Sequence, residues 1–369
     1  MKFICSRKTL LNGFSIVQKA VSTRTTLPIL EGVLIQAEGN TIKLIATDLE
    51  IGIEKSLEGE IIEEGSIVLP ANIIVELIRK LPDAPVEIKC DQEYRTKITC
   101  LKSEFVIQGQ SSEDFPNLPT IEDENSIEIP QDLLRNIIRQ TIFSVASDPT
   151  RPILTGALME IQSNELRLIA LDGYRLALRK GKTENRDNYG ISEVIPGKTL
   201  NEISKILTND DEMVRISRLD KQMLFEYENT KITTRLLEGE FINYNQILPD
   251  EYKTRIKVYT NDLIESCERA ELLARQGKNN LIKVEILQDQ LVITSNAEIG
   301  HVREELPIEI EGEELKIAFN SRYILDALKV IEEEEIYLDF TTSVSPCIIR
   351  PVEDDNFVYL ILPVRLLKE

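Results

Sequence analysis

The sequence predicts an α+β chain built from three repeats of one domain, and two observations support this. Thr26-Leu-Pro-Ile-Leu-Glu-Gly-Val-Leu34 returns as Arg151-Pro-Ile-Leu-Thr-Gly-Ala-Leu158, and Leu44-Ile-Ala-Thr-Asp48 returns as Leu168-Ile-Ala-Leu-Asp172. A weaker third repeat contains Leu281–Ile286 and Leu291–Asn296. Helix-type and strand-type apolar spacing also follow each other in the same order in every repeat.

Within each repeat, the sequence predicts two successive units, each with the order strand-helix-strand-strand-strand. Apolar residues at helical spacing, such as Leu10, Phe14 and Val17, predict helices over 6–20, 71–81, 131–146, 197–207, 261–276 and 320–330. Alternating apolar residues predict strands, for example Glu104–Gly109. The opening strands of the repeats are expected at Lys2–Cys5, Ser126–Ile129 and Arg255–Tyr259.

Pro-rich and acidic segments at Pro116–Asn125 and Pro249–Thr254 predict the joins between domains. The expected domains are therefore 1–122, 123–251 and 252–369, each with two helices against a mostly antiparallel sheet.

Composition excludes most catalytic chemistry. With one histidine, His301, the chain has no HExxH motif and no cluster of imidazole ligands, and no Ser-His-Asp triad could form without that residue. The polar sequence around His301 predicts a surface position. The five cysteines are scattered without metal-ligand spacing, so they are expected to be reduced and buried (Cys5, Cys90, Cys100, Cys267, Cys347). We expect no metal and no cofactor. No stretch resembles a membrane span or a signal peptide, which predicts a cytoplasmic protein.

Charge is distributed unevenly along this acidic chain, which has 43 basic and 63 acidic residues in 369. The six predicted helices together carry +5, and the rest of the chain carries −25. Basic residues follow the polar helix faces, and those expected to contact DNA are Lys8, Lys19, Arg79, Arg135, Arg139, Lys198 and Lys205. Because no base-reading motif accompanies them, the pattern predicts phosphate contact without sequence specificity, with the acidic sheets turned away from the DNA.

Several motifs in order along the chain resemble one family. They are Arg24-Thr-Thr-Leu-Pro-Ile-Leu30, Asp114-Phe-Pro-Asn117, Asp172-Gly-Tyr-Arg-Leu176 and Leu360-Ile-Leu-Pro-Val-Arg-Leu366. The chain resembles the bacterial DNA polymerase III beta subunits, the sliding clamps. The resemblance implies a head-to-tail homodimer, a ring of six clamp domains with helices inside and sheets outside. Such a ring encircles double-stranded DNA and has no catalytic site.

The resemblance also implies partners and site residues. The partners would be the replicative polymerase, the clamp loader, repair polymerases and other proteins that carry a clamp-binding motif, with no membrane, in a nucleoid-associated cytoplasmic protein. Arg24 would contact DNA, and Phe105 and Ile107 would face Leu272 and Leu273 across the dimer interface. A cleft for partner peptides would be lined by Leu154, Leu171, Gly173, Tyr174, Arg175, Leu176, Ile242, Ile247, Val344, Pro346, Leu360, Ile361, Leu362, Pro363, Val364, Arg365 and Leu366.

Departures from the family pattern and two alternatives complete the prediction. Tyr174, Leu171 and Gln246 differ from residues common in the family, so the peptide preference is expected to differ, and Leu367–Glu369 extend the usual end.

One alternative is a paralogous clamp for repair or for a mobile element. The other is a Mg²⁺-dependent nuclease using Asp48, Glu50 and Asp172, although Asp48 and Asp172 belong to different predicted domains and Asp172-Gly173 is typical of a turn.

Overall fold

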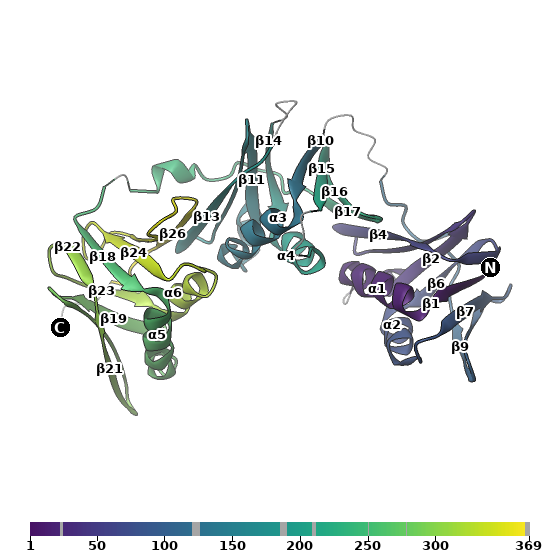
Figure 1. Cartoon of the computed structure of the whole chain (residues 1–369), viewed down its shortest axis with the longest axis horizontal. Helices are drawn as coiled ribbons and strands as arrows, with labels where there is room; N and C mark the ends of the chain where they lie inside the picture. The colour runs from purple at the N-terminus through teal and green to yellow at the C-terminus, as the bar shows by residue number, and fades with distance from the viewer. Residues whose placement is uncertain are drawn as a thin grey trace. The chain divides into compact units, whose positions relative to one another are not determined.

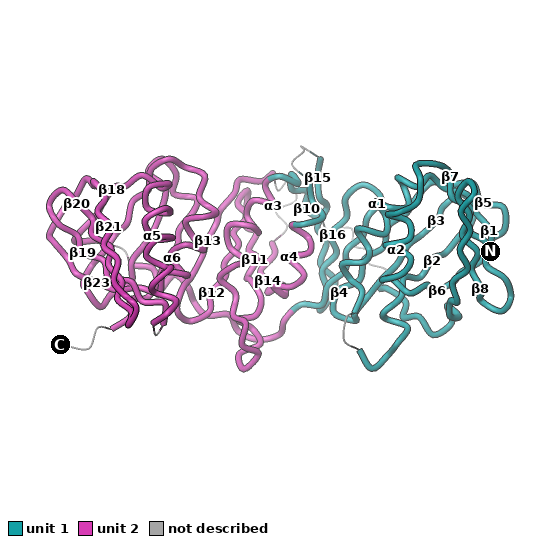
Figure 2. Tube along the Cα trace, turned by 90° about the horizontal axis from the view of Figure 1, so that it is seen from below, with its two compact units in different colours: residues 1–132, 205–236 teal, residues 133–204, 237–369 magenta. Residues whose placement is uncertain are grey.

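The computed structural model describes residues 1–22, 25–119, 126–184, 190–208, 212–249, 251–277 and 279–365. Two predicted site residues, Arg24 and Leu366, lie outside the described residues, as does the 367–369 extension. The chain forms two compact units (Figure 2). Unit 1 comprises Met1–Asp132 and Lys205–Leu236, and unit 2 comprises Leu133–Ser204 and Leu237–Glu369.

Three repeats of the same order of elements run through these two units. The first contains β1 (Lys2–Ser6), α1 (Arg7–Val17), β2 (Gly32–Glu38), β3 (Thr41–Thr47), β4 (Ile51–Glu58), β5 (Glu60–Glu63), β6 (Gly65–Pro70), α2 (Ala71–Lys80), β7 (Pro85–Cys90), β8 (Arg95–Cys100) and β9 (Ser103–Gln108). The second contains β10 (Ser126–Pro130), α3 (Gln131–Arg139), β11 (Gly156–Gln162), β12 (Glu165–Leu171), β13 (Arg175–Lys182), β14 (Ile191–Pro196), α4 (Gly197–Ile206), β15 (Met213–Leu219), β16 (Gln222–Tyr227) and β17 (Thr230–Arg235).

The third repeat follows the same plan. It contains β18 (Thr254–Tyr259), α5 (Thr260–Ala274), β19 (Leu281–Ile286), β20 (Gln290–Ala297), β21 (Gly300–Pro307), β22 (Glu309–Gly312), β23 (Leu315–Asn320), α6 (Ser321–Leu328), β24 (Glu335–Phe340), β25 (Cys347–Pro351) and β26 (Phe357–Ile361). The predicted doubled unit is therefore present three times, with all six predicted helices in place.

The strand pairings explain why three repeats form two units. An eight-stranded sheet has the order β10-β15-β16-β17-β4-β3-β2-β6, and a nine-stranded sheet has the order β14-β11-β12-β13-β26-β25-β24-β18-β22. The last strand of one repeat thus pairs with the third main strand of the repeat before it, as β17 does with β4 and β26 with β13. Because both sheets cross a junction between repeats, the strands of the second repeat are divided between the two units.

Local sequence signals account for the helix boundaries. Ser6 caps α1, because its hydroxyl accepts a hydrogen bond from the Thr9 backbone N–H at 3.0 Å. Asn320 caps α6 in the same way, because its Oδ1 accepts from the Arg322 backbone N–H at 3.0 Å. The helix expected over 131–146 is shorter, because α3 ends at Arg139. Thr141 Oγ1 donates back to the Ile137 carbonyl at 2.8 Å, and a short 3₁₀ turn follows.

The two short strands β5 and β22 were not predicted. Their sequences, Glu60–Glu63 and Glu309–Gly312, are only four residues long and half acidic, so they give too little apolar alternation to mark a strand. Each lies at the edge of its sheet, where charged residues are tolerated.

Helices and sheets share a packed core in each repeat. In the third, α5 and α6 lie side by side (Figure 1), and Cys267, Leu325 and Phe319 are buried in one apolar cluster with residues of β18 and β24–β26. All five cysteines are buried and free, as the sequence predicts. His301 is exposed, also as predicted. Among the described residues, no helix combines the length and hydropathy that a membrane span requires.

Candidate functional site

The turn between β12 and β13 carries the residues at the centre of the predicted peptide cleft. Asp172 Oδ1 accepts hydrogen bonds from the backbone N–H groups of Tyr174 and Arg175, at 2.8 and 3.1 Å. Gly173 has φ +93°, a left-handed conformation that glycine adopts without a Cβ clash. The turn therefore presents Tyr174 to solvent, where its side chain is 62% exposed.

Arg175 ties this turn to two other elements. Its Nε donates to Asp172 Oδ2 at 3.0 Å, Nη1 donates to Asp326 Oδ2 on α6 at 2.6 Å, and Nη2 donates to the Phe143 carbonyl at 2.7 Å. The guanidinium also lies over the Tyr323 ring, 4.4 Å from its centroid. Burial lowers the pKa of Arg175, but the two carboxylates outweigh burial and raise it, so the side chain stays charged.

The C-terminal strand completes the site. Leu360 of β26 lies opposite Leu176 of β13. Beyond the strand, the Leu362 N–H donates to the Tyr174 carbonyl at 2.8 Å, and the Val364 N–H donates to Ala318 at 2.8 Å. These backbone bonds hold Leu362 against the turn and Val364 against β23.

The predicted cleft residues separate into a buried floor and an exposed rim. Leu154, Leu171, Leu176 and Leu360 are 2–3% exposed and belong to one apolar cluster. The rim residues are at least one-third exposed: Tyr174, Ile242, Ile247, Val344 and Leu362. Exposed large apolar side chains of this kind are typical of a docking surface where they gather in one patch. Arg365 is exposed, and Pro346, Pro363 and Val364 are partly buried.

One predicted cleft residue faces elsewhere. Ile361 is fully buried in the cluster formed by α5, α6 and the sheets of the third repeat. Successive strand residues point to opposite faces, so Ile361 cannot share the face of Leu360. Residues that the sequence did not single out are Tyr323, Asp326 and Phe143, all in contact with Arg175. Tyr323 also stacks on Tyr174, with ring centroids 6.4 Å apart.

The basic residues expected to contact DNA differ in their surroundings. Lys8, Lys198 and Lys205 are exposed, and Lys19 is partly buried. Three arginines bind neighbours within the chain. Arg79 pairs with Glu76, Arg139 pairs with Glu332, and Arg135 donates to the Ser204 carbonyl. The helices are also unequal in charge, because α5 carries four acidic residues and one basic residue.

The predicted interface residues lie on β9 of the first repeat and on α5 of the third. Phe105 on β9 is 43% exposed, and Leu272 on α5 is 65% exposed. Leu273 is partly buried, while Ile107 is only 9% exposed and packs into its own repeat. Val106, which the sequence did not single out, is 61% exposed on β9.

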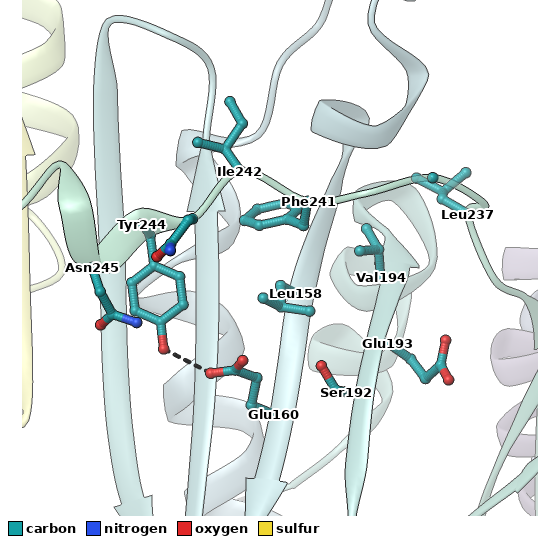
Figure 3. Close-up of a pocket in the computed structure, with 12 residues that line it drawn as sticks. Leu158, Glu160, Ser192, Glu193, Val194, Leu237, Phe241, Ile242, Tyr244 and Asn245 are labelled. Atoms are coloured by element: carbon teal, nitrogen blue, oxygen red, sulfur yellow. Dashed lines mark hydrogen bonds between the residues drawn. The ribbon is translucent and has the colours of Figure 1, made fainter.

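A cavity of about 320 Å³ lies in unit 2 (Figure 3). It is covered by the strap, the segment of residues 237–245, and its floor is β11 and β14. Ile242 of the cleft rim also lines this cavity. The Tyr244 hydroxyl donates to Glu160 Oε2 at 2.7 Å inside it.

Comparison with known proteins decides the family. Three models of the DNA polymerase III beta subunit match the N-terminal domain at residues 1–119, the central domain at 128–243 and the C-terminal domain at 245–365. The beta sliding clamp of Bacillus subtilis is 42% identical over 376 residues, which cover 99% of this chain and all of that protein.

The chain belongs to the DNA polymerase III beta subunit family. Solved structures agree. The sliding clamp of Bacillus subtilis aligns with a TM-score of 0.96 at 42% identity over 100% of both chains. The beta subunit of Thermotoga maritima aligns at 0.94 and 30% identity, covering 99% of this chain and all of that one.

Membership of this family establishes the fold and the kind of function. The chain consists of three clamp domains with antiparallel sheets, and it serves processive DNA replication as a sliding clamp without catalysing a reaction. DNA and a polymerase are therefore its partners. The nuclease alternative is wrong. Asp48 and Asp172 belong to different compact units, and each accepts backbone hydrogen bonds that shape its own turn.

Proposed function

We propose that two copies of the chain associate head to tail into a closed ring around double-stranded DNA. The ring slides without sequence specificity and holds the replicative polymerase near the primer end. The same ring would serve the clamp loader, repair polymerases and other clamp-binding proteins through the cleft, at the nucleoid in the cytoplasm.

The strand pairings within the chain support the proposed dimer. Both internal junctions pair the last strand of one repeat with the third main strand of the preceding repeat, β17 with β4 and β26 with β13. By position in the repeat, β9 corresponds to β17 and β26, and β21 corresponds to β4 and β13. Within the described residues, β9 and β21 are sheet edges. An intermolecular β9·β21 pair would repeat the same junction, and a head-to-tail contact of this kind can close a ring.

Charge favours pairing of these two edges. The hairpin of residues 95–108, which contains β8 and β9, carries a net +2, and the hairpin of residues 290–307, which contains β20 and β21, carries a net −2. Exposed Val106 and Phe105 on one side, and Leu272 on the other, add apolar surface. Opposite charges select the head-to-tail pairing over pairing of like edges.

DNA contact would come from the predicted basic residues of the helices and from Arg24. Phosphate contacts of this kind are weak and sensitive to salt, with non-specific dissociation constants on the order of 10⁻⁴–10⁻⁶ M. Enclosure by the ring would therefore supply the residence time, and the cleft would supply the tether for the polymerase.

The test compares retention on closed and open DNA. The protein is loaded on a nicked circular plasmid with a bacterial clamp loader and ATP, and its dissociation is followed before and after linearisation. We expect long retention on the circle and rapid loss from the linear form. Equal lifetimes on both would contradict enclosure.

Two edge variants test the dimer in the same assay. Val106→Asp places a charge in the proposed β9·β21 pair and should give a monomer that is lost from the circle. Ile62→Asp is the matched control, because Ile62 is 47% exposed on β5 at the other edge of the same sheet. Retention of a dimer by Val106→Asp would refute the proposed edge.

A further inference from the structure

The two junctions inside the chain share one strand register. β4, β13 and β21 occupy the same place in their repeats, and each is eight residues long. At the first junction Lys55, the fifth residue of β4, lies opposite Thr230, the first residue of β17. At the second junction Arg179, the fifth residue of β13, lies opposite Phe357, the first residue of β26. Both junctions therefore align their two strands in the same way.

Backbone hydrogen bonds beside these pairs agree as well. Ser56 N–H donates to the Asn229 carbonyl at 2.9 Å, and Lys180 N–H donates to the Asn356 carbonyl at 2.7 Å. In both cases the donor follows the fifth residue of its strand, and the acceptor precedes the first residue of the partner strand. Because antiparallel ladders alternate hydrogen-bonded and non-hydrogen-bonded pairs, the two junctions share this alternation too.

The same register can be applied to the proposed pair of β9 and β21. It places Ser103, the first residue of β9, opposite Glu304, the fifth residue of β21. Phe105 then lies opposite Val302. Val302 packs against the apolar cluster of the third repeat, and Phe105 shares its strand face with buried Ile107. The core-facing sides of the two hairpins therefore meet on one face of the combined sheet.

Charges on the other face are complementary in this register. Glu104 lies opposite Arg303, and Lys102, in the turn before β9, lies opposite Glu305. All four side chains are exposed. Within their own hairpins, Glu104 pairs with Lys97 at 2.7 Å and Arg303 pairs with Glu305 at 2.8 Å. The two pairs across the interface would therefore link two existing surface ion-pair networks, and opposite charges directly across two strands are stabilising.

Neighbouring registers bring like charges together. A slip by one residue turns the core-facing side of one hairpin to the other face, so only slips by two residues keep the faces matched. One such slip places Glu104 opposite Glu305, and the other places Lys102 opposite Arg303. Like charges directly opposite each other are destabilising. The charge order along β9 and β21 therefore favours one register over both of its neighbours.

We propose that a second copy of this chain is aligned by two ion pairs at each interface, Glu104 with Arg303 and Lys102 with Glu305. The proposal rests on the proposed head-to-tail dimer and adds what selects the partner and its register. A chain with a different order of charges along either edge strand would be disfavoured as a partner, so these four residues favour rings made of two copies of this chain.

The first test mixes two single variants. Glu104→Lys places a cation opposite Arg303, and Arg303→Glu places an anion opposite Glu104, so each variant alone should dimerise more weakly. In a mixed head-to-tail ring, one interface joins the two substituted positions and the other joins the two native residues. Both interfaces of the mixed ring are then attractive. Effects within a hairpin, such as the loss of the Lys97 pair, are equal in both kinds of ring and cancel.

One variant is isotopically labelled, the two are mixed and equilibrated, and native mass spectrometry counts the rings. We expect the dimer dissociation constant of each variant alone to rise about 25-fold, about fivefold at each of two interfaces, and about nine-tenths of the rings to be mixed. Glu60→Lys mixed with Arg303→Glu is the control, because Glu60 is exposed on β5 at the other edge of the same sheet. This control should pair at random, with about half of the rings mixed, because charge complementarity at the interface gives it no preference.

A disulfide reports the register directly. Ser103 and Glu304 form a non-hydrogen-bonded pair in the proposed register, and the Cα separation of about 4.5 Å in such pairs allows a disulfide. Ser103→Cys/Glu304→Cys should therefore give a covalent dimer on oxidation. The two slipped registers are represented by Ser103→Cys/Val302→Cys and Ser103→Cys/Leu306→Cys, which should cross-link poorly. Single cysteine variants are the controls, since the five native cysteines are buried.

The outcomes separate the register from the dimer. Random pairing of the two charge variants, or efficient cross-linking only in a slipped pair, would overturn the proposed register while the dimer stands. A wild-type chain that stays monomeric, or a dimer that survives Val106→Asp, would instead refute the proposed pairing of β9 with β21, and this inference with it.

Discussion

The turns at residues 47–52 and 171–176 occupy equivalent places in the first and second repeats and have the same pattern of backbone hydrogen bonds. Asp48 and Asp172 each accept hydrogen bonds from the N–H groups two and three residues ahead. Each turn also accepts a backbone bond from the next repeat, from Arg235 N–H to the Glu50 carbonyl at 3.0 Å and from Leu362 N–H to the Tyr174 carbonyl at 2.8 Å.

The side chains on this common backbone differ in polarity. The rim of the first turn has Glu50 and Arg235, and the rim of the second has Tyr174 and Leu362 at the same positions. Below the rim, buried Thr47 stands where the second turn has Leu171. In the first repeat Leu118 also packs against Gly52, where a Cβ would lie 2.3 Å from its Cδ2. The same turn therefore occurs twice with different side chains. The first exposes charged Glu50 and Arg235 beside apolar Leu49, whereas the second exposes Tyr174 and Leu362.

The largest loss of stability and peptide binding should come from replacing Arg175 with isoleucine, the residue at the equivalent position 51 of the first turn. Arg175→Ile removes three hydrogen bonds and leaves Asp172 and Asp326 without a cation. We expect a loss of about 2 kcal/mol, less than for a fully buried pair because Asp326 is about one-third exposed, and at least tenfold weaker peptide binding. Hydrogen exchange over 171–178 and peptide anisotropy measure the two effects.

The matched control for this change lies on the same strand. Arg179 pairs with Asp354 at 2.9 Å and lies four residues further along β13 than Arg175. Arg179→Ile should lower stability without weakening the peptide. Equal loss of binding in both variants would mean that Arg175 acts only through general stability of β13.

Exchanging the floor residues tests polarity beneath the rim. Leu171→Thr replaces a buried apolar side chain, but Thr47 shows that a hydroxyl at this place is satisfied, donating to the Ile51 carbonyl at 2.9 Å. We expect a loss of about 1–2 kcal/mol and about fivefold weaker peptide binding, since the floor loses apolar area. Thr47→Leu is the reciprocal change and should create no peptide site, because Glu50 and Arg235 still surround it. Peptide stoichiometry above one per chain in Thr47→Leu would contradict this.

Much of this comparison could be predicted from the sequence. The repeats Leu44–Asp48 and Leu168–Asp172 gave the two equivalent strands and turns, and helical spacing gave the six helices. These signals are local, because strand alternation and helix periodicity depend on neighbours within a few residues.

What could not be predicted depends on contacts that are distant in the sequence. Arg175 meets Asp326 across 151 residues, and no local pattern marks that pair. The resemblance places Ile361 in the cleft together with its neighbours, and Leu360-Ile-Leu362 is apolar throughout, so the sequence does not show which face each side chain takes. Only the register of β26 on β13 settles it, through Leu360 opposite Leu176.

The smallest expected effect comes from the exposed rim. Tyr174→Glu gives the second turn the residue of the first, and stability should change little because Tyr174 is 62% exposed and its main contact is the stack on Tyr323. Peptide binding should weaken about threefold, since a carboxylate replaces aromatic surface at the edge of an apolar cleft. Glu50→Tyr, the reciprocal control, should create no second peptide site, because its rim still contains Arg235 and its floor Thr47. Peptide stoichiometry above one per chain in Glu50→Tyr would mean that one aromatic residue at this turn is enough to make a cleft, and that floor and rim do not act together.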